Sequence, residues 1–175
     1  FGDTAVPDGA TNDGPDVVSA GQAVRLTVPL SGGAFGGVSV KTAGGVSGVY
    51  TVSLAGVQAV ALSGTPADAA VASANAGQTV KLLGTGLTLG TDVLLKWVNH
   101  VGGVEMLRLN PTQVSADGTS AQLDLPAYVN GVLQLQVLGS ASQPLLQIVP
   151  TIQRVDIQDR IALFGSGYIE GASTY

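Results

Sequence analysis

Hydrophobic and polar residues alternate with a period of two along most of this chain, most regularly in residues 93–98, 121–125 and 133–137. Because successive side chains of a strand point to opposite faces of a sheet, the alternation predicts strands with one buried face. Further strands are expected at 24–28, 38–40, 50–54, 80–82, 106–109, 145–149 and 161–163. Helical spacing is nearly absent. The small-residue segment 67–76 is interpreted as a linker that runs into a strand.

Glycine-rich turn signals separate these segments, as at Gly44-Gly45, Gly102-Gly103, Asp117-Gly118 and Asn130-Gly131. Such dipeptides favour hairpins and tight loops. Short strands at roughly 8–12-residue spacing predict an all-β fold of antiparallel β-sandwiches. The residues expected to point inward are Leu82, Val93, Leu95, Leu123, Leu125, Leu135 and Val137.

The sequence also repeats itself. Residues 78–90 align with 159–171 at an offset of 81, and residues 19–29 align with 116–126 at an offset of 97. The first alignment relates the front parts of two domains, and the second relates their back parts. Self-similarity at a fixed period is typical of repeat architectures. We therefore expect tandem β-sandwich domains, one complete and one split between the two chain ends.

The division expected from these alignments is 1–66 as the C-terminal part of one domain, 67–150 as a complete domain and 151–175 as the N-terminal part of the next. Gly86 precedes Pro126 by 40 residues, and Gly167 would precede Pro29 of a directly following copy by 37. This near-equality predicts that copies of the chain assemble head-to-tail. It leaves open whether the copies are covalently continuous.

Composition restricts the function classes. Seven Lys and Arg residues against twelve Asp and Glu residues give a net charge of −5, and the chain has no basic run, so a nucleic-acid partner is not expected. The absence of cysteine excludes disulfides and thiol chemistry. No apolar stretch reaches the roughly 18 residues of a membrane span, so none is predicted in this segment.

Four segments together resemble the IPT/TIG family of immunoglobulin-like domains: 77–87 with its Gly84-Thr85-Gly86, 114–126, 131–137 and the closing Val149-Pro150. The resemblance covers 77–150 in full, with 151–175 similar to the opening of a second domain and 16–54 to its remainder. It implies tandem stalk or adhesive modules of extracellular, bacterial cell-surface proteins. The chain lacks the basic DNA-contacting loops of the family's transcription factors.

The Gly-x-Gly signal is interpreted as a sharp turn. Neither Gly84-Thr85-Gly86 nor Gly165-Ser166-Gly167 continues into Gly-x-Gly-x-x-Gly followed by a helix, so a nucleotide cofactor is not expected.

Catalytic residues are not predicted. His100 is the only histidine, which excludes a histidine cluster within one chain, and its place between Trp97 and Gly103 indicates an exposed hairpin tip. No nucleophile and base can be paired, so we do not expect an enzyme. Trp97 and Met106 fall on facing strands, as a packed pair or as a sugar-stacking platform. Tyr128 and Tyr168 are candidate interface residues.

The candidate metal ligands are five oxygen-bearing side chains near the N-terminus: Asp3, Asp8, Asn12, Asp13 and Asp16. Calcium takes roughly six to eight oxygen ligands in irregular geometry, which such a segment could supply. Asp-Gly and Asn-Asp-Gly are also ordinary turn formers. Calcium binding and simple turns both remain open.

Two functions follow from the sequence. The first is a structural repeat unit of an extracellular bacterial fibre, stalk or sheath. The alternative is an adhesin, an Ig-like module that binds a glycan or a cell-surface protein through its loops.

Overall fold

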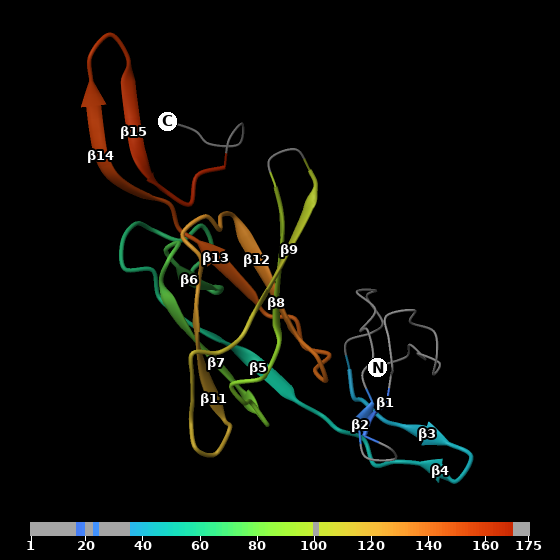
Figure 1. Cartoon of the computed structure of the whole chain (residues 1–175). Coiled ribbons are helices and arrows are strands. Elements are labelled where there is room, and N and C mark those ends of the chain that lie inside the picture. The colour runs from blue at the N-terminus through green and yellow to red at the C-terminus, as the bar shows by residue number, and fades with distance from the viewer. Residues whose placement is uncertain (1–16, 20–22, 25–35, 100–101, 170–175) are drawn as a thin grey trace.

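The computed structural model describes residues 17–19, 23–24, 36–99 and 102–169 (Figure 1). Every regular element in this part of the chain is a strand, and every strand pairing except one is antiparallel. The expectation of an all-β fold is confirmed. Among the residues described, no helix is long and apolar enough to cross a membrane.

Two larger sheets form the middle of the molecule. The four-stranded sheet has the order β10 (Gln113–Val114), β11 (Ser120–Asp124), β7 (Thr79–Thr85) and β5 (Ser53–Gln58). The five-stranded sheet has the order β6 (Ala72–Ala74), β13 (Leu145–Ile148), β12 (Val132–Val137), β8 (Val93–Val98) and β9 (Val104–Leu109). Strands β6 and β13 form the parallel pair.

Alternate residues of both sheets are buried in one hydrophobic cluster. Leu82 and Leu123 come from the four-stranded sheet, and Leu95 and Leu135, which are paired across β8 and β12, come from the five-stranded sheet. All seven residues predicted to point inward are buried. The architecture is therefore sandwich-like, with the core between the two sheets.

The sandwich includes a strand that lies before the expected boundary at residue 67. Strand β5 pairs with β7, and its Leu54 is fully buried in the common core. The Leu54 N–H donates a 3.0 Å hydrogen bond to Oγ of Ser140, on the other side of that core. The strand expected at 50–54 thus begins three residues later and completes the middle sandwich.

The segment 67–76 forms no helix. It contains turns and then β6, as expected for a linker that leads into a strand. Asn75, directly after β6, donates 2.9 Å hydrogen bonds to the carbonyls of Ser63 and Val149 and accepts one of 3.0 Å from the Ser63 N–H. The hydrogen bonds of the buried Asn75 side chain therefore hold the loop before β6 against the end of β13.

Three two-stranded sheets complete the described elements: β1 (Val17–Ser19) with β2 (Ala23–Val24), β3 (Lys41–Thr42) with β4 (Gly45–Val46), and β14 (Thr151–Ile157) with β15 (Ile161–Ser166). The strand expected at 38–40 is reduced to one bridge between Val38 and Tyr50. Figure 1 shows β14–β15 projecting from one end of the sandwich and β1–β2 beyond the opposite end.

Candidate functional site

The predicted metal ligands lie outside the described residues. Asp3, Asp8, Asn12, Asp13 and Asp16 all fall within 1–16, as His100 falls within 100–101, so the calcium interpretation stays a prediction. In the described part of the chain, no group of three or more His, Cys, Asp or Glu side chains could hold a metal ion.

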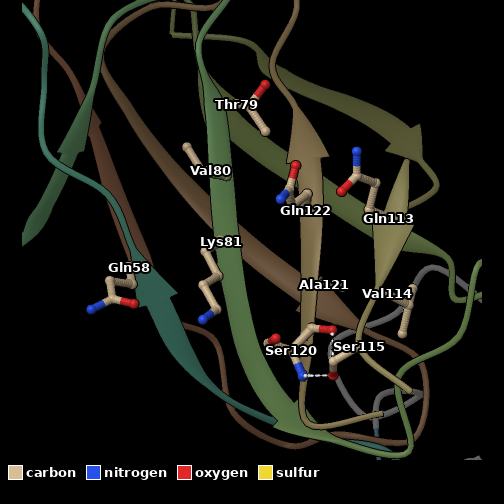
Figure 2. Close-up of a pocket in the computed structure, with 10 residues that line it drawn as sticks. All are labelled: Gln58, Thr79, Val80, Lys81, Gln113, Val114, Ser115, Ser120, Ala121 and Gln122. Carbon is tan, nitrogen blue, oxygen red and sulfur yellow. Dashed lines mark hydrogen bonds between the residues drawn. The ribbon is translucent and has the colours of Figure 1, made fainter. Parts of the chain in front are cut away.

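A shallow hollow of about 490 Å³ lies on the four-stranded sheet. A row of polar residues crosses it, one from each strand in register: Gln58, Lys81, Gln122 and Gln113. Figure 2 shows Gln122 and Gln113 side by side on β11 and β10. The row offers amide groups and a single charge, and no aromatic ring lines the hollow. It is a solvated sheet face.

A second hollow, of about 370 Å³, lies beside Trp97 and Tyr128. Met106 is paired with Lys96 and Trp97 with Glu105, so Met106 and Trp97 point to opposite faces of the sheet. Trp97 is only 9% exposed and belongs to the core, whereas Tyr128 is 65% exposed. The sugar-stacking platform of Trp97 with Met106 considered from the sequence is therefore not formed.

The hairpin β14–β15 repeats the pairing of β5 with β7. Ser53 pairs with Thr85, and Thr151, 98 residues after Ser53, pairs with Ser166, 81 residues after Thr85. Four further pairs match at the same offsets: Leu54↔Gly84 and Ile152↔Gly165, Gly56↔Leu83 and Arg154↔Phe164, Val57↔Leu82 and Val155↔Leu163, Gln58↔Lys81 and Asp156↔Ala162. Both ladders have a register shift between the second and third of these pairs.

The glycines of the two ladders have the same packing role. A Cβ on Gly84 would collide with the carbonyl oxygen of Ser53, and a Cβ on Gly165 would collide with that of Thr151. Gly86 and Gly167, two residues later, both have positive φ, of 71° and 78°. Such backbone is nearly free of strain only for glycine. The Gly-x-Gly signal thus marks the end of a strand. The first glycine packs closely against the backbone of the bulged neighbouring strand, and the second allows the turn that the sequence interpretation expected.

The two ladders differ in what covers them. Val80 of β7 is 2% exposed, whereas its counterpart Ile161 is 68% exposed. Leu54 of β5 is fully buried, whereas its counterpart Ile152 is 61% exposed. Burying one such side chain stabilises a protein by about 1.5–3 kcal/mol. The face of β14–β15 that corresponds to a core face therefore lies open.

The outer edge of β15 is open as well. Strand β7 pairs with β5 on one edge and with β11 on the other, whereas β15 pairs with β14 alone among the described strands. An unpaired edge presents a row of free N–H and C=O groups to another strand.

The hairpin β1–β2 shares one pair with β10–β11. Val17 pairs with Val24, and Val114 pairs with Ala121, both 97 residues later. The next pair of β1–β2, Ser19 with Ala23, follows a register shift that β10–β11 lacks. Strand β11 pairs with β7 on its other edge, whereas β2 pairs with β1 alone among the described strands. Both terminal hairpins, β1–β2 and β14–β15, thus have an edge without a partner among the described strands.

No family model matches the chain, and neither a curated protein nor a solved structure matches it. The resemblance to IPT/TIG domains therefore stays a prediction.

Sequence reasoning missed strand β14. The shift between Ile152 and Arg154 interrupts its alternation, so the period-two pattern is lost there. A signal was present in the similarity of 53–58 to 151–156 at an offset of 98, which the two alignments of the sequence did not include. Of the two candidate interface tyrosines, Tyr128 is exposed, and the hydroxyl of Tyr168 is buried without a hydrogen-bond partner.

Proposed function

We propose that this chain is a structural repeat unit of an extracellular bacterial fibre, stalk or sheath, built from tandem Ig-like sandwiches of IPT/TIG type that assemble head-to-tail. The observation that carries the proposal is the repeated strand register. One complete sandwich is flanked by β14–β15, which matches its β5–β7 at five pairs, and by β1–β2, which shares one pair with its β10–β11. Pieces of neighbouring sandwiches on either side are what an array of such domains requires.

The surface of the described residues supports a spanning role. The hollow on the four-stranded sheet is lined by neutral amides, hydroxyls, small apolar side chains and one lysine, without the convergent charged groups of a catalytic site. The large exposed apolar residues of β14–β15 lie at one end of the molecule, where an end-to-end contact would cover them (Figure 1). A contact between different patches of two copies propagates into a filament unless its rotation closes a ring.

Light scattering of the purified chain over a range of concentrations, with electron microscopy of the most concentrated sample, tests this function. We expect mass to rise with concentration and thin linear assemblies to form. A monomer of constant mass at every concentration, with no filaments, would contradict the structural function.

The alternative is an adhesin or a glycan- or protein-binding Ig-like module. The observation that favours it is the hollow beside Trp97, where Tyr128 is exposed and Oδ1 of Asn130 is buried without a partner. An exposed tyrosine next to amide groups is suited to a sugar or a peptide. Binding to a glycan array that is lost in Tyr128→Ala would favour this function.

A further inference from the structure

We infer that the open edge of β15 pairs antiparallel with the open edge of β2 in a second copy of this chain, in the register that joins β7 to β11. The inference rests on the proposed head-to-tail assembly, and it adds which two strands form the contact between neighbouring copies. In the sandwich, Ala121 pairs with Leu82 and Ser120 with Leu83. At the offsets of 97 and 81, these pairs become Val24 with Leu163 and Ala23 with Phe164.

Joining the two open edges would reproduce the strand order of the four-stranded sheet of the sandwich. The sandwich sheet runs β10, β11, β7, β5, and the joined sheet would run β1, β2, β15, β14. Both outer pairs already exist in the chain: β14–β15 matches β5–β7 at five pairs, and β1–β2 matches β10–β11 at the pair Val17 with Val24. Only the central pairing is missing, and it is the one that a second copy supplies.

Pairing within one chain is disfavoured by the arrangement of the molecule. Strands β1–β2 and β14–β15 lie beyond opposite ends of the sandwich in Figure 1. The central β7 and β11 separate them along the chain and already pair with each other. A strand from another molecule is therefore the occupant that reaches β15.

An exposed apolar residue in the segment that follows β2 also supports a second copy of the chain as the partner of β15. Val40 is 53% exposed, whereas Val137 of β12, which follows it by the same 97 residues, is fully buried in the sandwich core. In the sandwich, β12 lies in the sheet opposite β5 and β7. The segment around Val40 of the second copy would face the apolar side of β14–β15, so both surfaces would be covered at once.

Cysteine cross-linking tests the register, because the natural chain has no cysteine. The double variant Ala23→Cys, Phe164→Cys places one thiol on each partner strand. A disulfide requires Cα atoms within about 7 Å, which adjacent strands about 4.8 Å apart allow. We expect dimers, trimers and larger species on a denaturing gel without reductant, all of which return to monomer with reductant.

The matched control is Ala23→Cys, Arg154→Cys. Arg154 pairs with Phe164 across the hairpin, so it lies one strand further from the incoming edge, beyond disulfide reach. We expect no ladder from this control. Because Phe164 also packs on Arg154, at 4.0 Å from guanidinium carbon to ring centre, Val24→Cys, Leu163→Cys serves as a second test pair should the first disturb the hairpin.

The outcomes separate this inference from the function on which it rests. A wild-type chain that forms filaments while neither test pair gives a ladder would overturn the register and leave the structural function standing. A disulfide confined to monomers would overturn the second copy as occupant. A chain that neither assembles nor cross-links would overturn both.

Discussion

The carbonyl oxygen of Ser53 lies where a Cβ atom on Gly84 would have to sit. The contact arises because β5 bulges between Leu54 and Gly56 and brings its backbone over β7. Gly165 and Thr151 repeat it in the hairpin β14–β15. The two ladders therefore share both the register shift and the close contact that requires glycine.

Gly84→Ala should destabilise the sandwich by about 2–3 kcal/mol, because the added methyl group meets rigid backbone, which can relieve the overlap only by moving. Chemical denaturation measures the loss. The matched control is Gly90→Ala, where the nearest atom to the new Cβ is the Thr88 hydroxyl oxygen at 3.8 Å and φ is not positive. An equal effect of both substitutions would show that the contact with Ser53 is not what requires glycine.

Leu54→Ala should cost about 2–5 kcal/mol of unfolding free energy, since it empties a fully buried site in the core. The exposed Leu89 provides the control, and Leu89→Ala should change stability by less than about 0.5 kcal/mol.

The same strand sets the boundary of the sandwich. A chain that begins at residue 50 keeps the buried Val52 and β5 and should unfold cooperatively, whereas one that begins at residue 67 lacks both and should lose much of its stability. Equal melting temperatures for the two truncations would place β5 outside the cooperative unit.

Asp117 should make stability depend on pH in the acid range. The Ser115 hydroxyl, and then the N–H and hydroxyl of Thr119, donate to its carboxylate and lower the pKa of Asp117 from 3.8 to about 2. Because the folded pKa is depressed, the stabilisation is present above about pH 4 and is lost as the pH falls through about 2. The difference in melting temperature between the wild type and Asp117→Asn should therefore narrow from pH 4 to pH 2. A carboxyl resonance of Asp117 that titrates near 3.8 would contradict this.

The strands of the core could be predicted from the sequence because burial on one face enforces strict alternation. Strand β8 coincides with the predicted 93–98, and β12 begins one residue before the predicted 133–137. Here each inward residue meets the opposite sheet, so the pattern of the sequence and the packing agree.

The strands that differ from the prediction do so for separate physical reasons. Strands β5 and β14 contain a bulge, which shifts the inward residues by one position and breaks the period of two. Strand β6 is short and consists of Ala and Ser, which carry no strand signal. Strand β14 is also exposed on most of its residues, so no core selects its pattern.

The candidate contact site, the open edge of β15, could be predicted from the sequence in part. The alignment of 78–90 with 159–171 matched β15 to β7, and the structure adds that β14 pairs with β15 as β5 pairs with β7 and that β1–β2 shares one pair with β10–β11. An alignment matches one segment to another, so it could match β15 to β7 and indicate that β15 lacks a partner on one edge. The register describes which residues of two strands pair, and an alignment of single segments does not give it.

Hydrogen exchange at β15 most directly tests whether neighbouring copies complete a sandwich between them. Two copies joined from Tyr175 to Phe1 would be compared with a dilute single chain, with attention to residues 161–166. The amides of β15 that face away from β14 should exchange at least about 100-fold more slowly in the first copy of the joined chain, because β2 of the second copy accepts their hydrogen bonds. Equal exchange of these amides in the single and joined chains would contradict a shared sheet.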